Sequence, residues 1–309
     1  MRIVTAARRY PMSMARFFDA AMRRLGHDVV TVGPYSGDGG AIPWPGAPTF
    51  PQYVDRPDII LPEHLGSYPI TAIKSKLDNP DLIVSFDAGF RLLGEHSNCK
   101  SILYGTDPHA INYQPYYQDY AHFFSAQRQS VDTCPGAIWI PLAYDPTVHV
   151  ANVPIAEESR PLNICFVGVM GTSPGPENAY YQRYQAVRAL LAKFGGFAKQ
   201  GLIFDECTEV YNQAKIAFNW SSSWDLPMRL WEGAAYGCCV VTNRLPYLED
   251  VGFFDGETCI AFDSHEEMMS KVTEAIDTGS WVSIAKAGHD MVQSQTYDAR
   301  VEQILEYVF

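Results

Sequence analysis

Three side chains near residue 230 have the types and spacing to hold a nucleotide. Asp225, Arg229 and Glu232 stand at positions i, i+4 and i+7, and a helix would bring them onto one face. A carboxylate such as Glu232 suits the neighbouring hydroxyls of a ribose, and the fork of Arg229 suits a diphosphate. The alternative interpretation is an amphipathic helix whose polar face is only solvated.

The residues around this segment predict how it is positioned. Gly237 is expected to end the helix, because glycine adopts positive φ without strain, and the apolar residues 238–242 predict a strand directly after it. Ser222 lies among small residues that link the preceding strand to the helix, where a ligand could come close to the backbone. Such a junction in an α/β sheet is where nucleotides are usually bound.

Two other positions in the second half of the chain could contribute to an anion site. Gly168 opens a glycine-rich turn at residues 168–175, whose backbone N–H groups could point at phosphate oxygens. Lys215 stands just before a predicted strand and could add positive charge. An ordinary loop and a surface lysine are the alternatives.

The first half of the chain has its own candidates. Asp107 and His109 follow a predicted strand directly, and a carboxylate beside an imidazole is suited to acid–base or orienting work. Arg8 and Arg9 lie in the first strand-to-helix turn, where α/β proteins place ligands. We predict them as contacts to an anionic acceptor, with a solvated surface as the alternative.

Short apolar strands alternate with helical patterns, which predicts parallel sheets with right-handed crossovers. The first series has a helix at 13–25 and a long proline- and glycine-rich loop at 34–57. A linker at 150–161 separates it from a second series, which has a helix at 178–194, and the chain ends in a helix at 297–309. The predicted strands are residues 2–6, 28–33, 82–86, 101–105, 123–126 and 137–140 in the first series, and 163–167, 202–204, 216–219, 239–242 and 259–262 in the second.

Six segments, in order, resemble the CgeB-like (spore-maturation-protein-B-like) glycosyltransferases. The similarity covers roughly residues 100–262 and leaves the first hundred residues without a recognised signature. The segments are residues 107–109, 124–127, 139–146 with His149, 164–168, 210–219 and 225–243.

The resemblance implies an α/β protein of the GT-B fold, with two Rossmann-like domains whose parallel sheets face each other across a cleft. The domains would be residues 1–150, on the acceptor side, and 151–309, which would bind the nucleotide sugar, with the helix at 297–309 crossing back to the first. It implies transfer of a hexose, with Glu232 on the ribose of a donor that we expect to be a UDP-sugar. Many retaining GT-B enzymes have two glutamates separated by seven residues; Asp225 and Glu232 are one residue closer, so the resemblance favours retention only in part.

The absence of Asp-x-Asp and His-Glu-x-x-His motifs predicts a metal-independent reaction with no cofactor beyond the nucleotide sugar. The acceptor stays open between a polysaccharide, a protein, a small molecule and a modified DNA base. Two other functions remain possible: a non-catalytic nucleotide-sugar-binding protein, and a nicotinamide-dependent oxidoreductase, which the missing Gly-x-Gly-x-x-Gly disfavours.

Composition fits a globular protein with two domains. The chain has 309 residues, 47% of them hydrophobic, and no apolar run near the ~18 residues of a membrane span. Seven cysteines without metal-ligand spacing predict reduced thiols and a cytoplasmic location. The net charge of −12 disfavours a general nucleic-acid binder, although the first 24 residues hold six arginines and one acid.

Overall fold

The structure is a computed structural model that describes residues 1–41, 49–63, 66–86, 90–94, 99–170, 175, 178 and 180–309. The chain forms two compact units. Unit 1 is Met1–Pro141 together with Tyr297–Phe309, and unit 2 is Leu142–Thr296. The sequence placed the boundary at residue 150 and predicted a long loop at 34–57, of which residues 42–48 lie outside the described residues.

Unit 1 is built on a parallel sheet in the strand order β3-β2-β1-β5-β7-β8-β9. Strands β4 and β6 form a separate, two-stranded parallel sheet in the same unit. The strands are β1 (Arg2–Ala6), β2 (Asp28–Pro34), β3 (Ile59–Leu61), β4 (Ser67–Pro69), β5 (Leu82–Phe86), β6 (Arg91–Leu93), β7 (Lys100–Gly105), β8 (His122–Ser125) and β9 (Ile138–Trp139).

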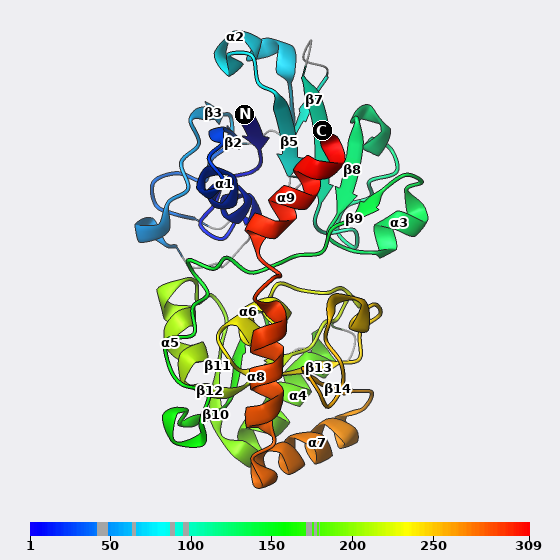
Figure 1. Ribbon diagram of the computed structural model, residues 1–309. Helices are drawn as coiled ribbons and strands as arrows, with labels where there is room; N and C mark the ends of the chain where they lie inside the picture. The colour runs from blue at the N-terminus through cyan, green and yellow to red at the C-terminus, as the bar shows by residue number, and fades with distance from the viewer. Residues whose placement is uncertain are drawn as a thin grey trace. The chain divides into compact units, whose positions relative to one another are not determined.

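Helices α1 and α9 lie side by side against one face of this sheet (Figure 1). Phe18 of α1 packs on Phe86 and Tyr104 of the sheet, with ring centroids 4.9 and 4.8 Å away. Phe17 stacks on Tyr297 of α9 at 5.5 Å. These aromatic contacts bury the last helix of the chain in unit 1. The helices of this unit are α1 (Met14–Arg24), α2 (Lys74–Leu77), α3 (Gln129–Thr133) and α9 (Tyr297–Val308).

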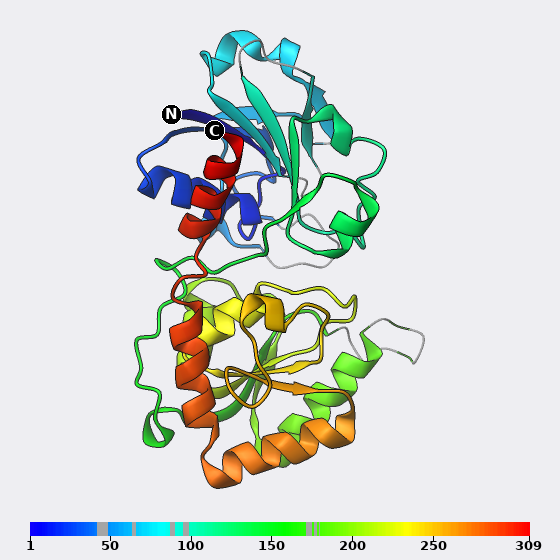
Figure 2. The same cartoon turned by 45° about the vertical axis from the view of Figure 1, so that its right-hand side comes forward.

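Unit 2 has a parallel sheet in the order β11-β10-β12-β13-β14, with helices on both faces (Figure 2). Side chains of α4 and α7 join one apolar core with the sheet, and side chains of α5 and the end of α6 join a second. The elements are β10 (Leu162–Val167), α4 (Tyr181–Phe194), β11 (Gly196–Lys199), α5 (Asp205–Gln213), β12 (Ala214–Asn219), α6 (Arg229–Ala235), β13 (Cys239–Asn243), β14 (Ile260–Phe262), α7 (His265–Thr278) and α8 (Trp281–Val292).

One predicted strand of unit 2 was wrong. Residues 202–204 are not a strand; the strand is β11, which begins directly after α4 ends. Gly196 allows this sharp return because a Cβ there would lie 2.1 Å from the carbonyl oxygen of Ile164 on the neighbouring strand. The sequence indicated Gly195 and Gly196 as a helix stop, and the second glycine also starts the next strand.

Candidate functional site

The carboxyl ends of β10, β12 and β13 meet at one edge of the unit 2 sheet, because the three strands are parallel neighbours. Asn219, the last residue of β12, donates from Nδ2 to Thr242 Oγ1 at 2.9 Å. Asn243, the last residue of β13, accepts the backbone N–H of Ser221 at 2.9 Å and donates to its carbonyl at 3.1 Å. Side-chain amides thus fix the chain where it leaves β12.

The segment from Ser221 to Asp225 is a tight turn that precedes α6. Ser221 Oγ is hydrogen-bonded to the Asp225 carboxylate and accepts the Asp225 backbone N–H at 3.1 Å. Trp224 adopts φ 60 and is 58% exposed; positive φ is uncommon for a bulky residue and is held by its surroundings. Ser222, predicted in the site, has a buried hydroxyl oxygen for which the described residues supply no partner.

The helix prediction for this segment needs a correction. Helix α6 begins at Arg229, so Asp225 belongs to the turn before it and does not share a helical face with Arg229 and Glu232. Pro227 and the Ser221–Asp225 bonds give this stretch a non-helical backbone. Glu232 remains on the helix, and Gly237 follows the last helical turn as predicted.

Arg229 reaches back from the start of α6 to the strand ends. Its Nε donates to the Val167 carbonyl at 2.8 Å, and its Nη1 donates to Asn219 Oδ1 at 2.7 Å. A Cβ on Gly168 would lie 2.6 Å from Arg229 Nη2, so glycine leaves room for the guanidinium. The backbone N–H of Gly168 itself donates to the Lys199 carbonyl at 3.2 Å, which corrects the prediction that it points at phosphate. Residues 171–174 of the predicted turn lie outside the described residues.

A second arginine lies at the same edge and was missed by the sequence analysis. Arg183, in the first turn of α4, is 8% exposed. Its Nε donates to the Trp220 carbonyl at 2.7 Å and its Nη1 to the Val169 carbonyl at 2.8 Å. The signal was available: Arg183 stands at helical spacing from the buried Val187 and Leu190, and an arginine on an apolar helix face is unusual.

Among the described residues, neither guanidinium is hydrogen-bonded to or ion-paired with an acid, although the charge of Asp225 acts on Arg183. Burial, and then the charge of Arg229, lower the pKa of Arg183 to about 10. Within the part of the chain that the structure describes, all four hydrogen bonds of the pair go to neutral oxygens, and neither Nη2 group has a partner. Buried charges are normally paired, so this edge of the sheet is suited to an anion.

Glu232 lies one turn further along α6 and contacts a buried histidine. Its Oε1 is 3.3 Å from His149 Nε2, and the two side chains are 21% and 6% exposed. The backbone N–H of Asp145 donates to His149 Nδ1 at 3.0 Å. From the sequence, His149 could be recognised only as part of a family-like segment, because its contact with Glu232 depends on the tertiary structure.

Lys215 does not belong to this edge, which corrects the prediction. It is the second residue of β12, at the amino end of the strand, and its ammonium group pairs with Glu157. Glu157 also accepts a hydrogen bond from Trp281 Nε1 at 2.8 Å. The pKa of Glu157 is lowered by the hydrogen bond from Lys215. The lysine is therefore part of a structural cluster that fastens residues 157–159 to the unit.

We expect Lys215→Met to leave the affinity for UDP within about twofold of the wild-type value. The melting temperature should fall slightly, since a partly exposed ion pair contributes about 0.2–1 kcal/mol. Glu157→Gln, which keeps an acceptor for Trp281, is the matched control and should behave in the same way. Calorimetric titration and thermal unfolding measure both quantities; a large loss of UDP affinity in Lys215→Met would return the lysine to the ligand site.

In unit 1, the predicted pair Asp107 and His109 lies in the loop after β7. His109 Nε2 is 2.8 Å from Asp107 Oδ1, and both side chains are almost half exposed. The backbone N–H of Asp107 donates to the Tyr113 hydroxyl at 3.0 Å, which fixes the start of the loop. The structure therefore brings the two residues together as a carboxylate-oriented imidazole at the carboxyl end of a strand.

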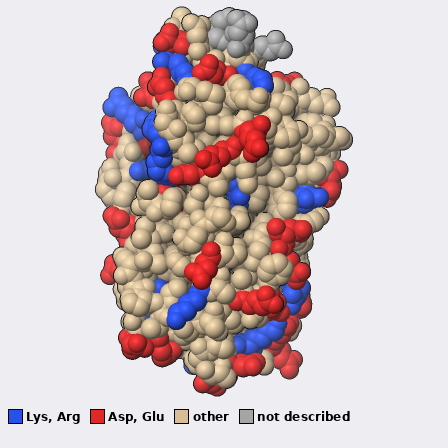
Figure 3. All heavy atoms as spheres, viewed as in Figure 1, with Lys and Arg blue, Asp and Glu red and all other residues tan. Residues whose placement is uncertain are grey.

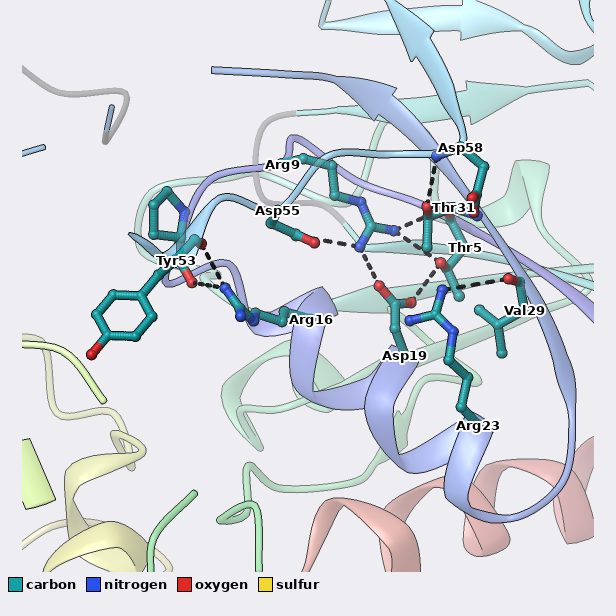
Figure 4. Close-up of polar contacts among 11 residues, drawn as sticks. Thr5, Arg9, Arg16, Asp19, Arg23, Val29, Thr31, Tyr53, Asp55 and Asp58 are labelled. Carbon is teal, nitrogen blue, oxygen red and sulfur yellow. Dashed lines mark hydrogen bonds and ion pairs between the residues drawn. The ribbon is translucent and has the colours of Figure 1, made fainter. Parts of the chain in front are cut away.

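Arg9, predicted as an acceptor contact, is a core residue, and that prediction is corrected. Its side chain is completely buried, pairs with Asp19 and lies 3.6 Å from Asp55 (Figure 4). Its Nη2 donates to the Thr5 hydroxyl at 2.9 Å and the Thr5 carbonyl at 3.1 Å. Burial alone would lower the pKa of Arg9, but the two carboxylates outweigh it and the pKa is raised.

The other arginines of the first 24 residues also make internal contacts. Arg8 donates to the Glu63 carbonyl at 2.8 Å, and Arg16 donates to the Tyr53 carbonyl at 2.7 Å. Arg24 pairs with Asp298 of α9. On the face seen in Figure 3, basic side chains lie in small groups next to acidic ones. The arginine-rich start of the chain is thus largely part of the framework of unit 1.

Neither a metal-binding cluster nor a membrane-spanning helix is found among the described residues. No group of three or more histidine, cysteine or acidic side chains there is arranged to hold a metal ion. None of the helices in that part of the chain has the length and apolar content that crossing a bilayer requires.

The chain is similar to known proteins in part of its sequence and in its fold. Residues 175–306 match the family model described as "Glycosyl transferase-like". No curated protein sequence matches significantly. Among solved structures, an alpha-glucosyltransferase in complex with UDP and a DNA 13-mer aligns with TM-score 0.65 at 12% identity, over 100% of this chain and 99% of the other.

Two further structures align over the whole chain. HepE from Anabaena, in complex with UDP and glucose, has TM-score 0.64 at 10% identity, with 100% and 99% of the two chains covered. Sucrose-phosphate synthase from Thermosynechococcus elongatus has TM-score 0.60 at 12% identity, with 100% and 98% covered. Residues 175–306 thus have the sequence pattern of a glycosyl transferase-like domain, and the chain as a whole has the GT-B fold of the glycosyltransferases.

Proposed function

We propose that this protein is a hexosyltransferase of the CgeB-like family that takes its sugar from a UDP-sugar without a metal ion. The observation that carries the proposal is the pair Arg183 and Arg229. Two guanidiniums whose Nη2 groups have no partner among the described residues lie at the carboxyl edge of a parallel sheet, where α/β folds bind nucleotides. A diphosphate supplies negatively charged acceptors for these two groups.

The other residues of the edge fit a nucleotide diphosphate sugar. Glu232 offers carboxylate oxygens one helical turn beyond Arg229 on α6, and we assign it to the ribose next to the diphosphate. The turn that precedes Arg229 in the chain carries Asp225 and Ser222, and the Ser222 hydroxyl has no partner among the described residues. We assign both side chains to the sugar. Retention at the anomeric carbon, which the partial two-acid motif favours, is part of the proposal.

The reaction needs charge stabilisation on the leaving group. As the bond between the sugar and the diphosphate breaks, negative charge grows on UDP, and Arg183 and Arg229 are already in place to stabilise it. In unit 1, His109 is the candidate to contact the acceptor hydroxyl, with Asp107 orienting its ring. We propose uracil as the base of the donor because two of the solved structures that align with this chain contain UDP.

The charge of the protein argues against DNA as the acceptor. The alpha-glucosyltransferase that aligns with this chain was solved with DNA, so a modified DNA base is one alternative. Duplex DNA is held chiefly by exposed lysines and arginines. Here the net charge is −12, and Arg9, Arg16 and Arg24 are engaged inside unit 1. We therefore favour an uncharged sugar, a glycan or a small molecule as the acceptor.

The test is calorimetric titration with UDP-glucose, UDP, UMP and uridine, followed by an assay of UDP release from UDP-glucose. Affinity should fall steeply from UDP to uridine, and Glu232→Ala should weaken all four ligands by about 10- to 150-fold. A chelator should change neither binding nor turnover.

Three results would contradict the proposal. If none of the four ligands binds, the site is not a nucleotide site. Equal affinity for UDP and uridine would exclude a diphosphate contact at the arginine pair. Tight binding of UDP-glucose, without release of UDP in the presence of glycans, small sugars or hydroxymethylated DNA, would favour a non-catalytic binding protein.

A further inference from the structure

Glu232 is held from one side by a histidine whose own position is fixed. His149 is 6% exposed, and its Nε2 is 3.3 Å from Glu232 Oε1. Among the described residues, Glu232 Oε2 has no partner. One carboxylate oxygen is thus occupied by the protein, and the other is available to a ligand.

The tautomer of His149 follows from its contacts. The backbone N–H of Asp145 donates to Nδ1 at 3.0 Å, so Nδ1 is the accepting nitrogen and carries no proton. In the neutral imidazole the proton is then on Nε2, the nitrogen that faces Glu232 Oε1 at 3.3 Å. The backbone of one turn therefore determines which ring nitrogen faces the carboxylate.

The turn that carries His149 is closed by several hydrogen bonds. Asp145 Oδ1 accepts the backbone N–H of Thr147 at 2.8 Å and its hydroxyl at 2.6 Å. The carbonyl of Asp145 accepts the backbone N–H groups of Val148 and His149 at 3.1 and 2.9 Å. Because both ends of the turn are fastened, the backbone of His149 has little freedom.

The ring of His149 is also confined by its packing. It lies edge-on to the ring of Tyr236, with centroids 5.7 Å apart. The Tyr236 hydroxyl is 2.8 Å from Thr208 Oγ1 and donates to the Val148 carbonyl at 3.3 Å. Tyr236 thus holds both the imidazole and the turn behind it. The turn and Tyr236 therefore fix the imidazole with Nε2 facing Glu232.

We propose that His149 is a positioning residue that orients Glu232 toward the two ribose hydroxyls of the donor. It occupies one lone pair of Oε1 and fixes the plane of the carboxylate, so that Oε2 and the remaining lone pair of Oε1 face the diol. This proposal rests on the proposed function, since it assigns the ribose to Glu232. It adds a residue that acts through the carboxylate and need not touch the ligand.

The experiment compares UDP with 2′,3′-dideoxy-UDP, which lacks both ribose hydroxyls, in three single variants. His149→Phe keeps a ring against Tyr236 and removes the donor. His149→Gln places an amide N–H close to the position of Nε2. Glu232→Gln alters the carboxylate itself. We expect His149→Phe to weaken UDP about tenfold, the effect of one hydrogen bond to a charged group, and to leave dideoxy-UDP unchanged. His149→Gln should restore most of the UDP affinity.

A double-mutant cycle gives a second measurement. Once Glu232→Gln is present, adding His149→Phe should cost UDP affinity little more, because both changes remove the same interaction. Thermal unfolding of each variant confirms that the protein is folded.

The outcomes separate this inference from the proposed function. Wild-type UDP affinity in His149→Phe, or equal losses for UDP and dideoxy-UDP, would make His149 structural. If the wild-type protein binds UDP and dideoxy-UDP equally, Glu232 does not hold the ribose and the inference falls, while the donor proposal stands. If the wild-type protein binds neither nucleotide, the proposed function itself has failed.

Discussion

Replacing Arg183 with glutamine should weaken UDP binding by about 10- to 150-fold, the range expected for a lost charged hydrogen bond. The loss should be smaller for UMP and absent for uridine, because the guanidinium is assigned to the diphosphate. Inorganic pyrophosphate should raise the melting temperature of the wild-type protein and not that of the variant. Calorimetric titration of the three ligands and thermal unfolding measure these effects.

We expect a large effect because the buried charge of Arg183 destabilises the folded protein when no anion is bound. Burial, and next the charge of Arg229, hold its pKa at about 10. A base whose folded pKa lies below its unfolded value destabilises the folded state in full at any pH below the folded pKa, which includes neutral pH. That cost is lost progressively as the pH rises from the folded pKa to the unfolded one. An anion between the two arginines offsets it.

The control for this prediction is Arg188→Gln on the same helix. Arg188 is exposed and its guanidinium lies over the ring of Tyr184, 5.6 Å from the centroid, so its removal should change UDP affinity less than twofold. A structural Arg183 would give the opposite pattern to the one expected. UDP affinity would be unchanged, and the melting temperature of the ligand-free protein would fall through loss of the bonds to Val169 and Trp220.

Much of the fold could be predicted because its signals are local. Short apolar strands between helical patterns indicated two parallel sheets, and Gly237 indicated the end of α6. The start of that helix could not be read from spacing alone. Ser221 bonds to Asp225 only because Asn243, on another strand, holds Ser221 in place. The i, i+4, i+7 pattern therefore predicted a helix that begins one turn too early, at Asp225 instead of Arg229.

Site residues that directly follow a strand could be predicted from the sequence. Site residues that lie on a helix were harder to predict. Lys215 could have been excluded from the sequence alone, since it precedes a strand, and parallel sheets bind ligands at the carboxyl ends. The helical spacing of Arg183 indicates only that it is buried; its contacts with the carbonyls of Val169 and Trp220, one of them far away in the chain, depend on the tertiary structure. Arg9 was misjudged for the same reason, because its partner Asp55 lies far away in the chain, within the loop predicted at 34–57.

Replacing Arg9 with methionine should destabilise unit 1 by about 3–5 kcal/mol, the usual cost of removing one partner of a buried ion pair. The change leaves Asp19 buried with its charge uncompensated. Arg8→Met, next in the chain and partly exposed, is the matched control and should cost less than about 0.5 kcal/mol. Hydrogen exchange of β1 and α1, followed by mass spectrometry, reports the free energy of unfolding of this unit separately from unit 2.

The loss in Arg9→Met should depend on pH with a definite sign. Burial, and then the neighbouring Asp19, already raise the pKa of Asp55 against the opposing charge of Arg9, and without Arg9 the folded pKa of Asp55 rises further. A carboxyl whose folded pKa is raised costs no stability below its unfolded pKa and costs progressively more as the pH increases through the folded value. The difference between wild type and variant should therefore be larger at pH 8 than at pH 5. Adding Asp19→Leu should recover part of the stability at pH 8, since it removes the unpaired charge. Equal losses in Arg8→Met and Arg9→Met, or a loss that does not change with pH, would mean that Arg9 is not held by these two carboxylates.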